Sequence, residues 1–182
     1  MTSRLILSLT LALCALLPAA AHAQDQKRLT IEDYFLMLPA GPWLQGSARE
    51  QLKYVRDNKQ GVIDVANGYI SLNGYNEQPS IQVTFFADRA DSVLVAVCYG
   101  LMGKPDFTHL AFFEQAPDPD GGLTPLKRLI PVKRDIFPVG NAPAGAYFGL
   151  PREGKTITVY DSTSSAVRRR FTWGEERFRE VK

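Results

Sequence analysis

Cysteine and histidine are scarce in this sequence, and their scarcity limits the chemistry that the chain can carry. The 182 residues include two cysteines and two histidines. Cys14 and His22 lie in an N-terminal segment that we expect to be removed, which leaves Cys98 and His109. A single cysteine forms no internal disulfide. One cysteine and one histidine also cannot supply a Cys₂His₂ or His₃ zinc site within one copy, so we expect no metal and no cofactor.

The sequence also lacks an excess of either charge. It contains 21 lysine and arginine residues against 19 aspartate and glutamate residues. Removal of the N-terminal segment takes away only Arg4, which leaves the chain close to neutral. Attraction to nucleic acid or to an anionic membrane depends on a strong positive balance. We therefore expect no nucleic-acid partner.

A long apolar run occurs at the N-terminus and nowhere else. Residues 1–23 combine a basic start at Arg4, an apolar run and the small-residue motif Ala21-His22-Ala23. This is the pattern of a secretory signal peptide, and the run is too short and wrongly flanked for a membrane span. Cleavage after Ala23 gives a mature chain that begins at Gln24.

The form of this signal is bacterial, so we expect a periplasmic or secreted protein. Cys14 suggests a lipoprotein, but Leu13 stands where a lipoprotein signal needs a small residue, so we expect no lipid anchor. No second long apolar run follows, so the mature form is expected to be soluble and to lack a transmembrane segment. Residues 24–182 have the size of a single domain and contain no linker.

Two helices are predicted near the start of the mature chain. The first opens at Thr30, has an apolar stripe at helical spacing, and ends at Pro39. The second begins with the capping box Ser47-Ala48-Arg49-Glu50 and runs towards Asn58.

The segment Ser80–Gly100 predicts the central hairpin of the protein. Two apolar, β-branched and aromatic runs flank residues 88–91, which we read as a four-residue loop. With a simple loop, Phe85 lies opposite Leu94. Both faces of this hairpin are largely apolar, so it belongs in the middle of a sheet that is covered on both sides.

Further strands are predicted on either side of this hairpin. Before it, 62–65 and 69–72 flank a tight turn at Asn67-Gly68. After it come 107–114, a proline-rich excursion over 115–145 with one short element near 126–136, and strands at 146–150, 155–161, 166–173 and 177–181. The predicted fold class is α+β: two N-terminal helices followed by one largely antiparallel, strongly twisted sheet of about seven to nine strands in a single domain.

The last long hairpin predicts an irregularity. With 162–165 as the loop, strict pairing places Val159 opposite Arg168 and mixes apolar with basic residues on both faces. We therefore expect another register or a β-bulge near Arg168–Arg170. Trp173 is expected to anchor the sheet end in the core, and at least two of the three arginines to reach solvent.

Four blocks of the sequence, TIEDYFLMLP at 30–39, NGYISLNG at 67–74, LPREGKTITVYD at 150–161 and FTWGEERF at 171–178, resemble blocks of small exported bacterial proteins of unknown function. The resemblance implies an exported, single-domain protein. It transfers no catalytic, cofactor-binding or metal-binding residue.

Cys98 and His109 are the first pair to consider as nucleophile and base. Cys98 lies mid-strand on the face assigned to the core, where a thiol behaves as a small apolar group. His109 alternates with Phe107, Ala111 and Phe113, and Glu114 falls on the opposite face of the strand. We expect both Cys98 and His109 to be structural.

Other polar clusters also favour a structural interpretation. The run from Asp118 to Gly122 starts like a calcium loop, but Leu123 and Leu129 occupy the positions that require glycine and glutamate. Arg168-Arg169-Arg170 splits between two strand faces, so a solvated or ion-paired strand is the default and an anion-binding patch the alternative.

Three functions stay open at this point. The first is a non-enzymatic binding or accessory protein of the cell envelope that presents a sheet surface or loop to another envelope protein. The second is a small hydrolase that uses carboxylates, with Asp88, Asp91, Asp106 and Glu114 as candidates. The third is a carrier of a small apolar ligand, with phenylalanine and tyrosine residues around a pocket.

Overall fold

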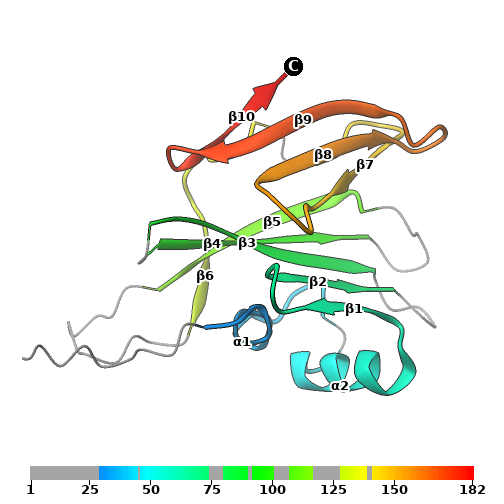
Figure 1. The fold of residues 1–182 in the computed structure, drawn as a ribbon, viewed down its shortest axis with the longest axis vertical. Helices are drawn as coiled ribbons and strands as arrows, with labels where there is room; N and C mark the ends of the chain where they lie inside the picture. The colour runs from blue at the N-terminus through cyan, green and yellow to red at the C-terminus, as the bar shows by residue number, and fades with distance from the viewer. Residues whose placement is uncertain are drawn as a thin grey trace, which may run out of the picture.

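The computed structural model describes residues 29–44, 46–73, 80–89, 92–100, 107–116, 128–138 and 141–182. Within these residues, two short helices precede ten strands, and the strands form two antiparallel sheets (Figure 1). The helices lie against one face of the larger sheet and the smaller sheet lies against the other (Figure 1). The α+β prediction with one sheet is therefore wrong: the protein is mostly β and has two sheets.

Both helices begin where their capping residues predict. In α1 (Ile31–Leu36) and α2 (Ala48–Asn58), the N-cap side chains of Thr30 and Ser47 accept a hydrogen bond from the third helical N–H, and the acidic residue there bonds back to the cap. Each such cap stabilises a helix by about 1 kcal/mol. No helix in the described part of the chain combines the length and apolar character that a membrane span needs.

The larger sheet is a meander in which strand order follows chain order. Its strands are β1 (Gly61–Asp64), β2 (Tyr69–Leu72), β3 (Ile81–Arg89), β4 (Ser92–Tyr99), β5 (His109–Gln115) and β6 (Leu129–Pro131). The turn at Asn67-Gly68 joins β1 to β2 as predicted, with Gly68 at a φ of 66°. β6 is the short element expected within the proline-rich excursion; residues 117–127 lie outside the described residues.

The smaller sheet is built from the C-terminal strands. These are β7 (Ala146–Gly149), β8 (Thr156–Asp161), β9 (Val167–Gly174) and β10 (Arg177–Val181), in the order β10-β9-β8-β7. Apolar residues alternate along each strand, so one face of this sheet is buried and the other is exposed.

The central hairpin separates two cores. Val83, Val95 and Val97 point to the helix-side core, where they meet residues of both helices such as Phe35 and Leu52. On the other face, Phe86, Leu94, Ala96 and Cys98 meet the smaller sheet in the inter-sheet core. The expectation that the hairpin is covered on both faces is confirmed.

The predicted register of this hairpin is wrong by one residue. Phe86, not Phe85, lies opposite Leu94, and the pairing shifts between Ala87 and Arg89. β3 has one more residue than β4 between these two pairs, which is a β-bulge. A regular four-residue loop has no such additional residue. As a result Phe86, not Phe85, shares its face with Leu94, Ala96 and Cys98.

The second sheet exists because the central hairpin needs two covering layers. Two short helices cover one of its apolar faces, and the other face needs an equally broad apolar surface. Phe148, Ile157, Val159 and Phe171 provide it, and each is at most 1% exposed. Extension of the larger sheet by β7–β10 would have left both sets of side chains in water, at a cost of about 1.5–3 kcal/mol for each.

Polar contacts hold the two sheets together at their margins. The Phe148 N–H donates to the Phe107 carbonyl at 2.8 Å, so the β7 edge meets the segment that leads into β5. The Leu150 N–H donates to Gln82 Oε1 at 3.0 Å. These contacts fix the margins of the inter-sheet core.

Candidate functional site

Cys98 and His109 do not form a catalytic pair. Tyr99 lies opposite His109 in the β4–β5 ladder, and the two rings stack with centroids 5.1 Å apart. Cys98, the neighbour of Tyr99, points to the other face of the sheet, into the inter-sheet core. It is fully buried, and burial raises the pKa of its thiol well above the usual value. The predicted position of Cys98 in the core is confirmed.

His109 belongs to the margin where the two sheets meet. Its Nδ1 lies 3.3 Å from Asn141 Oδ1, and a backbone bridge joins the same two residues. Its Nε2 is buried and has no hydrogen-bond partner among the described residues. Ring stacking and this amide contact give His109 a structural position. Glu114 lies on the other face of β5, as predicted.

Of the four candidate carboxylates, only Glu114 has a described side chain. Glu114 Oε2 lies 3.1 Å from Arg134 Nη1. Asp91, Asp106 and the side chain of Asp88 lie outside the described residues, as does the run from Asp118 to Gly122. Within the part of the chain that the structure describes, no three His, Cys, Asp or Glu side chains are placed to hold a metal ion.

The arginine run lies at the β-bulge that the sequence predicts. Tyr160 pairs with Val167 and Val159 pairs with Arg169, so Arg168 is the additional residue. Arg168 and Arg170 are exposed and Arg169 is half-buried, which confirms that at least two arginines reach solvent.

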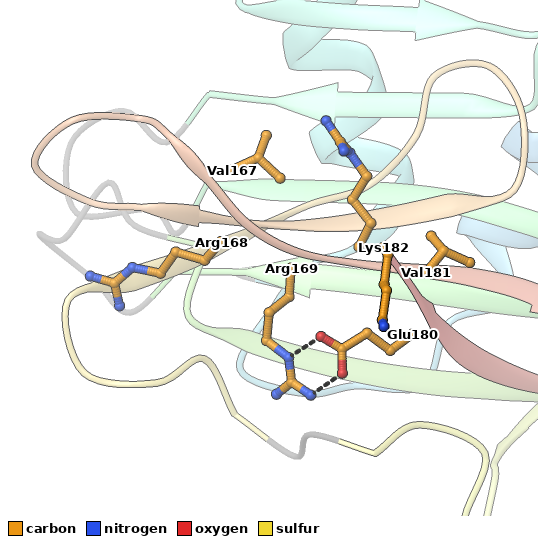
Figure 2. Close-up of a pocket in the computed structure, with 7 residues that line it drawn as sticks. Val167, Arg168, Arg169, Glu180, Val181 and Lys182 are labelled. Carbon is orange, nitrogen blue, oxygen red and sulfur yellow. Dashed lines mark hydrogen bonds and ion pairs between the residues drawn. The ribbon is translucent and has the colours of Figure 1, made fainter.

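A groove opens at this end of the smaller sheet (Figure 2). It has a volume of about 650 Å³ and is lined by Val167, Arg168, Arg169, Arg170, Glu180, Val181 and Lys182. We call it the basic groove, because four of these side chains are cationic and one is anionic. β9 and β10 provide six of the lining residues.

Two of the arginines are held by carboxylates. Arg169 donates two hydrogen bonds to Glu180, at 2.8 and 2.6 Å, and its guanidinium lies 4.8 Å from the centre of the Phe171 ring (Figure 2). The same pairing lowers the pKa of Glu180. Arg168 extends away from this pair in Figure 2 and binds Asp161 through Nε at 2.9 Å.

Asp161 is itself held by the loop after β8. The N–H groups of Thr163 and Ser164 each donate to its Oδ1 at 2.9 Å. The Ser164 N–H, the Arg168 guanidinium and the Thr163 N–H, in decreasing order of effect, place the pKa of Asp161 well below its usual range. The carboxylate therefore stays ionised and keeps Arg168 in place.

The other two cations of the groove are unpaired. Among the described residues, neither Arg170 nor Lys182 forms an ion pair. Arg170 lies opposite Val181 and is exposed. Val167 and Val181 are 43% and 40% exposed, so apolar surface adjoins the two free charges.

A pair of tyrosines extends this surface along the sheet. Tyr147 and Tyr160 are cross-strand neighbours on the outer face, with ring centroids 5.2 Å apart and nearly parallel planes. Gly149 makes room for them, because a Cβ there would lie 2.7 Å from Tyr160 Cε2. Among the described elements, none packs on this outer face (Figure 1).

The sequence indicates the arginines of this site but not their surroundings. Side chains alternate between the two faces of a strand, so in 155–161 Tyr160 points away from the face of Val159. The sequence therefore predicts that Tyr160 points outward. Val181 and Lys182 become groove residues through the pairing of β10 with β9. The predicted strand at 177–181 favours this pairing, but it does not show which arginine Glu180 neutralises.

Comparisons with family models, with curated proteins and with solved structures find no match to this chain.

Proposed function

We propose that this chain is an exported, non-enzymatic binding protein of the cell envelope. In this proposal the basic groove at the end of the smaller sheet, together with the adjoining outer face, binds an acidic segment of another envelope protein. The signal-like residues 1–23 and the resemblance to small exported bacterial proteins support export.

The free charge of the basic groove carries the proposal. Asp161 and Glu180 neutralise Arg168 and Arg169, while Arg170 and Lys182 have no ion-pair partner among the described residues. An acidic segment would neutralise both of these cations. The exposed Val167 and Val181 would then be covered by its apolar side chains, as in the mixed surface of a protein interface.

The edge of β10 supports an extended partner. The Phe178 N–H points away from β9 and donates to the Ile136 carbonyl at 2.8 Å, which covers the first part of this edge. Alternation places the N–H and C=O of Glu180 on the same outer side. An extended acidic segment is able to pair with the backbone there while its carboxylates contact the groove.

The two alternative functions have less support. For a hydrolase, the one candidate carboxylate with a described side chain is Glu114, and it forms an ion pair with Arg134. For a carrier of an apolar ligand, the space between the sheets is already occupied by phenylalanine side chains such as Phe86, Phe148 and Phe171, each at most 1% exposed.

Site-directed photo-crosslinking tests the proposal. A photoreactive amino acid at Val167 should yield a defined crosslink to one protein in envelope extracts of the encoding organism. The same label at Arg49, which is exposed on α2 in the helical layer, is the control. Arg170→Glu in the Val167-labelled chain should abolish the crosslink, whereas Arg49→Glu should leave it unchanged.

Salt provides a second criterion. Charges at the surface are screened over about 10 Å at 0.1 M salt, so the crosslink should weaken as salt rises. A crosslink that survives Arg170→Glu, or equal labelling from Val167 and Arg49, would contradict the proposed binding face.

A further inference from the structure

The two unpaired cations of the basic groove lie on opposite faces of the smaller sheet. Arg170 of β9 is the cross-strand partner of Val181 in β10, so these two side chains share one face. Lys182 follows Val181 directly, and consecutive side chains of a strand point to opposite faces. In Figure 2 the Lys182 side chain accordingly extends to the side of Glu180, away from Val167. A single carboxylate on one face therefore cannot contact both cations.

Neither face supplies a free carboxylate to its cation. The cross-strand neighbours of Arg170 are Thr158 and Val181, neither of which is charged. On the other face Glu180 is already occupied, because it accepts two hydrogen bonds from Arg169, at 2.8 and 2.6 Å. Among the described residues, each face of the sheet end therefore lacks one negative charge.

The edge of the smaller sheet beside these cations is open to another strand. β10 is an edge strand of this sheet. The Phe178 N–H donates to the Ile136 carbonyl, which covers the start of the edge. Because the direction of the backbone groups alternates along a strand, the N–H groups of Glu180 and Lys182 point to the same outer side. A second extended chain is therefore able to pair with β10 at these two residues.

We propose that the acidic segment binds as an added strand on β10 and is recognised by two adjacent acidic residues, one for each face. Neighbouring side chains of the added strand point to opposite faces, so one carboxylate reaches Arg170 and the next reaches Lys182. Arg170 lies one strand inside the edge, about 10 Å from the added strand, a gap that an arginine and a glutamate side chain span together. This inference rests on the proposed function, because it names the pattern by which the same groove selects its partner.

Two fluorescently labelled peptides of equal composition test this pattern. One peptide carries Val-Glu-Glu-Val between serine and threonine residues, and its isomer carries Glu-Val-Glu-Val, which places both carboxylates on one face of an added strand. Fluorescence anisotropy at low salt should show about fivefold tighter binding of the first peptide, the gain expected from one additional surface ion pair.

Three single substitutions assign the contacts. Arg170→Gln and Lys182→Gln should each abolish the preference for adjacent carboxylates, because one cation is left for either peptide. Arg177→Gln removes an exposed arginine of β10 that does not line the groove, so it is matched in charge and should retain the preference. Binding of the first peptide should also protect the Glu180 N–H from hydrogen exchange, which reports the added strand.

The outcomes separate this inference from the proposed function. Equal binding of the two peptides, or a preference that survives Arg170→Gln, overturns the recognition of adjacent carboxylates and leaves the binding face in place. An unprotected Glu180 N–H in the bound state overturns the added strand. A crosslink from Val167 without binding of either peptide also overturns this inference alone. The absence of both the crosslink and peptide binding overturns the inference together with the proposed function.

Discussion

Arg152 Nε lies 2.6 Å from Asp64 Oδ2, and this ion pair joins the two sheets. Asp64 ends β1 in the larger sheet, and Arg152 lies in the turn between β7 and β8 of the smaller one. The Asp64 carboxylate also accepts from the side chain and the backbone N–H of Asn67, at 2.9 and 3.1 Å. One carboxylate thus holds both the β1–β2 turn and a contact between sheets.

The first prediction concerns acid stability. The Asn67 side chain, the Arg152 guanidinium and the Asn67 N–H lower the pKa of Asp64 from 3.8 to about 2. A carboxyl whose pKa is lower in the folded state stabilises the fold above its unfolded pKa and loses this effect as pH falls through the folded pKa. We expect Asp64→Asn to lower stability at pH 7 and to flatten the loss of stability between about pH 4 and pH 2.

Urea denaturation over this pH range measures the effect. Arg152→Gln is the informative comparison, because it keeps both contacts with Asn67 and should give an intermediate slope. An Asp64→Asn variant with the slope of the wild type would show that this carboxylate is not linked to folding.

Local features of the fold could be predicted from the sequence, because they depend on neighbouring residues. Thr30 and Ser47 are followed by an acidic residue at the third helical position, which defines a cap without reference to the rest of the fold. The bulge at Arg168 follows from the conflict between the apolar pattern and the length of one loop.

The arrangement of sheets and sites could not be predicted in this way. The apolar faces of the central hairpin show that two covers are needed, but they do not show that one cover is a second sheet. The hairpin register depends on one irregularity between Ala87 and Arg89. The ion pair of Glu114 in β5 with Arg134 joins residues that are 20 positions apart, and no local pattern encodes that meeting.

The second prediction concerns Trp173 and Arg169, which lie four positions apart in β9. Trp173→Ala removes a buried ring from the inter-sheet core and should cost about 3–5 kcal/mol. Arg169→Ala breaks a partly exposed ion pair and should cost about 1 kcal/mol or less. Equilibrium urea denaturation of the two variants gives both values, and Trp173→Phe should fall between them. Small and equal losses would show that β9 and β10 are only loosely attached.

The third prediction compares two glycines with positive φ. Gly61 opens β1 at a φ of 152°, and a Cβ there would lie 2.2 Å from the Ser71 carbonyl oxygen. Gly154, at a φ of 82°, has nothing within 4 Å of the same position. We expect Gly154→Ala to cost about 1–2 kcal/mol from backbone conformation alone. Gly61→Ala should cost clearly more, because the β2 backbone has to move.

Thermal unfolding of both glycine variants checks this difference. Equal shifts in Tm would show that β1 adjusts without disturbing its pairing with β2.

The last prediction concerns the thiol of Cys98. Cys98 is fully buried between the sheets, its Sγ donates a weak hydrogen bond to the Phe107 carbonyl at 3.7 Å, and burial raises its pKa. Thiol reagents attack the exposed thiolate, so labelling requires that the two sheets separate. We expect native labelling to be orders of magnitude slower than labelling in denaturant, with a rate that follows the free energy of unfolding.

N-terminal sequencing of the same sample should find Gln24 first, so that Cys98 is its single thiol. Cys98→Ala/Glu153→Cys, with the thiol in an exposed turn, should label at the denatured rate under all conditions. Rapid native labelling of Cys98, with folding intact, would show that the sheets open at this point and would return Cys98 to consideration as a reactive residue. An acylated Cys14 at the N-terminus would contradict the predicted cleavage site.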